Sequence, residues 1–172
     1  MELEEMQTRL EKELPAKRFH HTVAVSQTAV ELARLYGVDE KKAAIAGMLH
    51  DSGRQIPKKD FIAKAAELGI PLDEVEKAQP ILIHAKLGAY YAEHEFGVTD
   101  PDILSSIRYH TTGGAHMSPL AMVIYLADLI EPHRDFEGVD TLRQQVRQGL
   151  EYGMLKAYIH TMAYLMEQGQ LI

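Results

Sequence analysis

The sequence predicts an all-α protein, a compact bundle in which several helices run antiparallel to their neighbours. Apolar residues recur every three or four positions along nearly every segment, which is the period of a helix buried on one face. No stretch alternates polar and apolar residues for long enough to indicate a sheet. With 172 residues and no linker or shift in composition, we expect one domain covering residues 1–172.

The N-terminal half divides into helices at recognisable start and stop signals. The first predicted helix covers residues 3–14 and stops near a proline, and the second covers 17–36 and ends at Gly37, a typical helix C-terminus. Asp39 is a suitable N-cap for a third helix that reaches residue 50. After a break at 55–57, we expect further helices over about 58–68, 73–77 and 81–96.

The C-terminal half begins its helices at two proline signals. Asp100-Pro101 predicts a helix to His110, and Ser118-Pro119 predicts an apolar helix to Ile130, because proline is well tolerated in the first helical turn. Between them the segment TTGGAHM, residues 111–117, reads as a loop. After a second loop from Pro132, the last two helices are expected over about 139–148 and 151–168.

Composition excludes several classes of protein. The net charge of −7 without a cluster of lysine and arginine argues against binding to nucleic acid polymers. The absence of cysteine leaves nitrogen and oxygen as the only ligands for a metal. The start of the chain does not resemble a signal peptide, and the longest apolar run, residues 120–130, is too short for a bilayer and contains Asp128. We therefore expect a cytoplasmic protein without a membrane partner.

The stretch AGMLHDSGR, residues 46–54, contains the adjacent pair His50 and Asp51. A neutral imidazole beside a carboxylate suits a divalent metal, because the carboxylate can bridge two ions. The dipeptide alone is weak evidence, since it occurs often by chance. The metal interpretation therefore depends on other ligand types on buried helix faces.

Four further polar residues fall on apolar helix faces, where they should be buried: His21, His84, His110 and Asp128. Taken singly, an inward histidine usually bonds a carbonyl, and an inward aspartate usually serves helix packing. With His50 and Asp51 they form an inventory suited to two metals with Asp51 between them. By contrast, His116 and His133 lie in predicted loops beside this site, where supporting or substrate-binding roles are open.

The order of these residues resembles the H…HD…H…H…D signature of the HD-domain metal-dependent phosphohydrolases. Longer motifs, RFHHT (18–22), AGMLHDSGR (46–54), HAKLGA (84–89) and IRYHTTG (107–113), resemble the YqeK branch over almost the whole chain. The resemblance implies a helical HD-type bundle with two divalent metals, iron first, with manganese or zinc as alternatives. It also implies symmetrical hydrolysis of diadenosine tetraphosphate to two ADP by a metal-activated hydroxide.

Carried over by position, the resemblance implies roles for individual residues. His21, His50, Asp51 and Asp128 would hold one metal, and Asp51, His84 and His110 the other. Asp51 and Arg54 would be catalytic, and the substrate would contact Arg18, Arg54, Thr112, Gly113, His116 and Arg134. There are two departures, since the family commonly has lysine at Arg54 and arginine at Gly114. The second departure puts one phosphate contact in doubt.

Other functions remain open at this point. Within the hydrolases, the runner-up is a phosphatase for nucleoside monophosphates or another phosphorylated metabolite. A di-iron oxygenase uses a similar ligand set, and a non-catalytic HD-like signalling module is a third class, although such modules typically lose ligands. The expected partner is a dinucleoside polyphosphate or another nucleotide, and a homodimer is left open.

Overall fold

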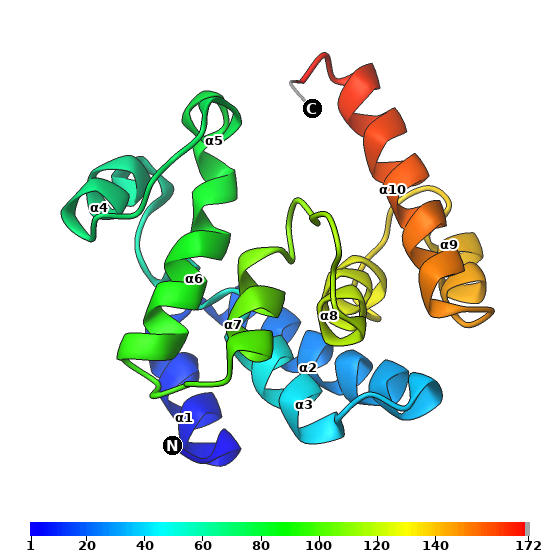
Figure 1. Cartoon of the computed structure of the whole chain (residues 1–172), viewed down its shortest axis with the longest axis horizontal. Helices are drawn as coiled ribbons and strands as arrows, with labels where there is room; N and C mark the ends of the chain where they lie inside the picture. The colour runs from blue at the N-terminus through cyan, green and yellow to red at the C-terminus, as the bar shows by residue number, and fades with distance from the viewer. Residues whose placement is uncertain (171–172) are drawn as a thin grey trace.

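The computed structural model describes residues 1–170 and confirms an all-α fold, because these residues contain helices and no strand. Figure 1 shows the chain as helices packed around a central group of α2, α3, α7 and α8. The elements are α1 (Leu3–Glu13), α2 (Ala16–Tyr36), α3 (Glu40–Leu49), η1 (Ser52–Gln55), η2 (Lys58–Asp60), α4 (Phe61–Glu67), α5 (Glu74–Ala78), η3 (Pro80–Leu82), α6 (Ile83–His94), α7 (Pro101–Arg108), α8 (Pro119–Ile130), α9 (Val139–Val146) and α10 (Leu150–Glu167).

The predicted helix signals act through the expected hydrogen bonds. The Asp39 side chain accepts the backbone N–H groups of Lys41 and Lys42 at the start of α3. Ser118 likewise accepts from Ala121 at the start of α8. Gly37 ends α2 with φ 68°, a left-handed conformation that glycine adopts at little cost.

Two helices end earlier than the sequence predicts, each just before a histidine that we had expected inside the helix. Helix α3 ends at Leu49 and α7 at Arg108, so His50 and His110 lie just beyond helix ends rather than within helices. In both cases the imidazole Nδ1 hydrogen-bonds to the carbonyl three residues earlier, at 2.7 Å for His50 and 2.6 Å for His110. That carbonyl would otherwise accept a backbone N–H in a continuing helix, so the side chain competes with it.

Two other predicted helices each divide into a short 3₁₀ segment and an α-helix. The predicted helix 58–68 consists of η2 and α4, and the predicted helix 81–96 consists of η3 and α6. Pro80 occupies the first position of η3 and has no N–H to donate. The periodic pattern therefore predicted the helical segments correctly, but it did not show that each one is interrupted between a 3₁₀ turn and an α-helix.

Two close backbone approaches bring the central elements together. A Cβ on Gly47 of α3 would lie 2.7 Å from the Cα of Ser26 in α2, so only glycine permits this contact. A Cβ on Gly53 of η1 would lie 2.8 Å from the backbone nitrogen of Gly88 in α6. Because His50 and Asp51 lie between these two glycines, they are held between α2 and α6.

The buried apolar residues form two clusters. The larger one joins α1, α2, α3, α6, α7, α8, α9 and α10. A smaller one joins Phe61 and Ala65 of α4 to Ile83, Leu87 and Tyr91 of α6. None of the helices in residues 1–170 is long and apolar enough to cross a membrane.

Candidate metal centre

The structure brings together all six predicted metal ligands. His21 lies in α2, His84 near the start of α6 and Asp128 in α8, while His50, Asp51 and His110 lie at helix ends. Their ligand atoms form three overlapping groups, each with all its atoms within 4.8 Å of one another. The groups are His21, His50 and Asp51; His50, His110 and Asp128; and Asp51, His84 and His110.

Asp51 lies at the centre, with its two oxygens facing different histidines. Its Oδ2 lies 3.8 Å from His21 Nε2 and 3.6 Å from His50 Nε2. Its Oδ1 lies 3.2 Å from His84 Nε2 and 3.8 Å from His110 Nε2. Because a carboxylate can bridge two cations with its two oxygens, this arrangement divides the histidines into two pairs around one bridging group.

Three of the histidines have a fixed tautomer. A backbone carbonyl can only accept a hydrogen bond, so each Nδ1 next to one carries the proton. The Nδ1–H groups donate to the carbonyl three residues earlier: His50 to Gly47, His84 to Ile81 and His110 to Ile107. In the neutral rings, all three Nε2 atoms therefore present lone pairs toward Asp51, as metal ligation requires.

The chemistry of these atoms fits divalent cations. The Nε2 atoms of His84 and His110 lie 3.1 Å apart, and two lone pairs at that distance repel each other unless a cation or proton lies between them. The Nε2 atom of His50 is buried and has no hydrogen-bond partner within the described chain. Buried polar atoms are normally satisfied. This donor set thus fits divalent metal binding.

Glu131 contacts a candidate ligand of the centre, although the sequence analysis did not select it. Its side chain is 2% exposed, and Oε1 lies 3.1 Å from His21 Nδ1. Its Oε2 accepts the backbone N–H of His133 at 2.7 Å and lies 3.0 Å from His133 Nδ1. A signal was present, because Glu131 follows Asp128 by three residues and so shares its helix face.

Asp128 combines several interactions at the edge of the centre, where its side chain is 20% exposed. Its Oδ1 lies 3.0 Å from His21 Nε2 and 3.7 Å from His50 Nε2. Arg134 Nη2 donates to the same oxygen at 2.7 Å, and Arg134 Nε donates to the Asp128 backbone carbonyl at 2.8 Å. The carboxylate is thus paired even before any metal binds.

The environment keeps the inner histidines neutral and the central carboxylate ionised. Burial lowers the pKa of His110 to about 3 and also lowers the pKa of His50. Burial on its own would raise the pKa of Asp51. The imidazoles of His50 and His84 and the guanidinium of Arg54 outweigh it, so that pKa lies well below its usual value.

The pair formed by His21 and Asp128 behaves differently. Burial lowers the pKa of His21, but hydrogen bonds with Asp128 and Glu131 outweigh it and leave that pKa above the ordinary value. Burial raises the pKa of Asp128, but the hydrogen bond with His21 and the imidazole of His50 outweigh it and lower that pKa. A proton on His21 Nε2 would therefore compete with a metal.

The predicted substrate contacts fall into two groups. Arg18 and Arg54 lie at the centre, where each donates to one oxygen of Asp51 at 2.9 Å. Arg18 and Arg134 also line a cavity of about 780 Å³ beside His21, together with Lys17 and His133. Two of the predicted substrate contacts thus line the same cavity as the candidate ligand His21.

The predicted substrate contacts in the loop 111–117 do not touch the candidate ligands as Arg18 and Arg54 do. The N–H of Gly113 donates to the carbonyl of Tyr109 at 2.9 Å. Thr112 donates to the carbonyl of Gly113 at 2.9 Å. His116 and Gly114 are exposed, and within residues 1–170 no hydrogen bond or ion pair joins His116 to the centre. The proposed substrate contacts of Thr112, Gly113 and His116 stay predictions.

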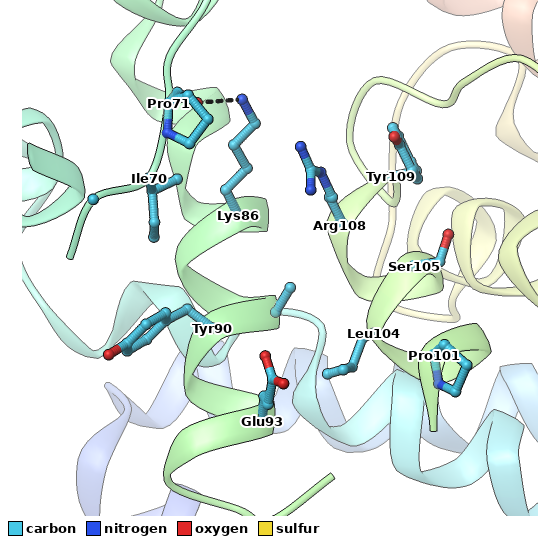
Figure 2. A pocket seen from close by; sticks show the side chains of 12 residues that line it. Ile70, Pro71, Lys86, Tyr90, Glu93, Pro101, Leu104, Ser105, Arg108 and Tyr109 are labelled. Carbon is cyan, nitrogen blue, oxygen red and sulfur yellow. Dashed lines mark hydrogen bonds between the residues drawn. The ribbon is translucent and has the colours of Figure 1, made fainter. Parts of the chain in front are cut away.

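A second cavity, of about 510 Å³, lies between α6, α7 and the segment around Pro71. Figure 2 shows Lys86 and Arg108 projecting into it from opposite sides. The Lys86 ammonium donates to the carbonyl of Pro71 at 2.8 Å and to Glu76 at 2.7 Å. This cavity contains none of the six candidate ligands in its lining, so we assign the chemistry to the cavity beside His21.

Comparisons with known proteins agree with this geometry. The family model of the HD domain matches residues 18–132. A crystal structure from Clostridium acetobutylicum, described as a predicted HD superfamily hydrolase involved in NAD metabolism, superposes with a TM-score of 0.94 at 34% identity, covering 100% of this chain and 91% of that one. The chain therefore belongs to the HD-domain metal-dependent phosphohydrolases.

Within that class, this chain is one of the YqeK branch. It is 41% identical to the symmetrical bis(5'-nucleosyl)-tetraphosphatase of Bacillus subtilis, over 99% of this chain and 91% of that protein. It is 37% identical to the protein of the same name from Halalkalibacterium halodurans, over 92% of this chain and 84% of that protein. The organisation of residues 1–172 as a single domain stays a prediction.

Proposed function

We propose that this protein hydrolyses diadenosine tetraphosphate symmetrically to two ADP, with two divalent cations held by the six residues of the candidate metal centre. The names of the relatives support the substrate and the symmetry of cleavage. The resemblance makes iron the first metal to test, and manganese and zinc also suit imidazole and carboxylate ligands.

The observation that carries the proposal is the position of Asp51 between two pairs of histidines. His21, His50 and Asp128 would complete one metal position with Asp51, and His84 and His110 the other. When bound, the cations supply a water of lowered pKa and positive charge beside the phosphoryl oxygens. Asp51 would hold the two positions in fixed relation, since Arg18 and Arg54 orient its oxygens from either side.

The arginines would also act on the substrate. The Arg18 and Arg134 side chains are 33% and 37% exposed, so both can reach an anion in the cavity beside His21. Arg54 is 25% exposed at the side chain and lies on the opposite oxygen of Asp51. Fixed cations of this kind stabilise the charge that develops on the equatorial oxygens of a phosphoryl group during transfer.

Product analysis tests the proposal. Metal-free protein is loaded anaerobically with ferrous iron, manganese or zinc and incubated with diadenosine tetraphosphate, and nucleotides are separated by chromatography. We expect two ADP per substrate. ATP with AMP would contradict symmetrical cleavage, and faster release of phosphate from nucleoside monophosphates would favour the phosphatase. Oxygen uptake with a polyol would favour the oxygenase.

A matched pair of variants on α6 links the products to the centre. His84→Gln removes one Nε2 ligand. Because losing only a partner that orients a ligand already costs about 10- to 100-fold, we expect loss of bound metal and at least about a hundredfold loss of ADP formation. His94→Gln changes the same residue type at an exposed position where the ring stacks on Tyr90, and it should retain both. Parental activity in His84→Gln would contradict the assignment.

A further inference from the structure

Helix α10 carries an apolar face that nothing in the described chain covers. One side of this helix supplies its buried residues, Gly153, Met154 and Ala157. The opposite side carries five apolar side chains that are 41% to 67% exposed: Tyr152, Leu155, Ile159, Met162 and Met166. At 100° per residue, these five fall within one narrow stripe. We call this stripe the α10 seam.

The spacing along the seam is that of a coiled coil. Its members follow one another at intervals of three, four, three and four residues. This alternation is the a and d pattern of a heptad, which packs against another helix rather than against a sheet or a loop. The helix has 18 residues, or about 27 Å of length, so the seam runs along nearly all of it.

The second half of α10 depends most on such packing. None of its residues from Tyr158 to Glu167 is buried. Figure 1 shows this half continuing past α9 toward the top of the view. A helical segment as short as this half is only marginally stable in water unless an apolar face packs against another element. An occupant of the seam would supply that packing.

We propose that the occupant is a second copy of this chain, and that the two α10 helices pair in parallel about a two-fold axis. Glu151 and Lys156 flank the seam and are five residues apart. In a parallel pair this is the spacing of interhelical ion pairs, so Glu151 would face Lys156 of the partner subunit, and the reverse. No ion pair within residues 1–170 occupies either side chain. The Lys156 ammonium lies 5.2 Å from the centroid of the Tyr152 ring.

Charge also argues against the antiparallel arrangement. An antiparallel pair centred on Ile159 would separate Glu151 from Lys156 of the partner subunit by roughly 16 Å along the axis, so their ion pair would be lost. The body of each subunit packs on the side of α10 opposite the seam. Two copies can therefore approach along the seam with their remaining helices on the outside.

Sedimentation velocity over a range of protein concentrations tests the interface. We expect the parent protein to dimerise and Ile159→Glu to raise the dissociation constant at least about a hundredfold, because it places two charges at the middle of the seam. Tyr164→Glu is the matched control, since Tyr164 is 55% exposed on the same helix but lies off the seam. It should dimerise like the parent. A monomeric parent protein, or an Ile159→Glu variant that dimerises normally, would overturn the proposal.

Disulfide trapping in the folded protein tests the register without relying on a destabilising variant. The chain has no cysteine, so a single introduced thiol can form a disulfide only with the same thiol of a second subunit. Leu155→Cys should form a disulfide-linked dimer under mild oxidation. If instead Leu155→Cys stays unlinked and becomes linked only when mixed with Met162→Cys, the helices are antiparallel and the proposal is wrong. A dimer that none of these seam thiols can link would place the interface elsewhere and would also overturn it.

Discussion

The Nε2 atoms of His84 and His110 face each other at 3.1 Å, although each ring has already donated its Nδ1 proton to a backbone carbonyl. Neither nitrogen carries a proton in the neutral ring, so the contact joins two lone pairs. The hydroxyl of Thr111 lies 3.2 Å from the His110 nitrogen and can satisfy only one of them at a time. The pair is therefore arranged for a cation and is unfavourable without one.

The first prediction concerns metal and stability. A divalent cation that binds the folded protein alone should raise the midpoint of thermal unfolding, since ligand at a thousandfold excess over its dissociation constant adds about 4 kcal/mol. Thermal unfolding is followed by circular dichroism with ferrous iron, manganese or zinc, and then after a chelator. His84→Gln should show a smaller shift. An unchanged midpoint with every metal would contradict the assigned centre.

The second prediction concerns pH. The pKa of His110 is about 3 in the folded protein, against an ordinary value near 6.5. Between pH 6.5 and 5 the unfolded chain therefore binds more protons at this residue, and the folded state loses up to about 1.4 kcal/mol per pH unit as the pH falls. His50 is lowered in the same direction.

Urea unfolding of metal-free protein at several pH values between 5 and 7 measures this dependence. We expect His110→Gln to flatten the slope, since glutamine does not titrate. The pKa of His21 is raised in the folded protein. At pH values well below the ordinary histidine pKa, His21 is protonated in both the folded and the unfolded state, so it does not contribute to the pH dependence of stability there. An equal slope in the parent and His110→Gln would show that His110 is not held neutral by burial.

The third prediction concerns Glu131, which holds His21 through Nδ1. Glu131→Gln should weaken metal binding about 10- to 100-fold, the usual effect of losing a partner that orients a ligand histidine. Glu137→Gln, an exposed acidic residue in the following loop, is the control and should bind metal normally. Metal titration followed by calorimetry gives both affinities. Equal affinities would assign Glu131 a packing role only.

The fourth prediction concerns the close approach of η1 to α6. In Gly53→Ala the new Cβ would collide with the carbonyl oxygen of His84 and would lie 2.8 Å from the Gly88 nitrogen. Overpacking against backbone typically costs about 1 to 3 kcal/mol, and here it would also displace His84. Denaturant unfolding and metal content measure the two effects. Gly149→Ala, whose nearest contact would be 3.5 Å, should be tolerated in both respects.

Much of the fold could be predicted because its signals are local. Asp39 and Ser118 cap their helices through side-chain oxygens within three residues, and Gly37 ends α2 by its own conformation. The ends of α3 and α7 could not be predicted in the same way. There, His50 and His110 turn their rings back onto the helix carbonyls.

The α10 seam shows a different limit of sequence reasoning. Its heptad spacing is visible in the sequence, but Met154 and Ala157 on the other side of the helix are apolar as well. Periodicity alone therefore does not tell which side meets the body of the protein. The structure decides this, because α8 and α9 contact α10 and leave Leu155 and Ile159 exposed.

By itself, the sequence determined which side chains face inward, because helical period and residue chemistry are properties of each segment alone. His21, His84 and Asp128 could be selected in this way. Only the tertiary structure decided that Asp51 lies between two pairs of histidines, that Glu131 supports His21, and that Arg18 and Arg134 line one cavity. Those relationships join residues far apart in the chain, and they exist only once close packing, such as that at Gly47 and Gly53, has fixed the distances between helices.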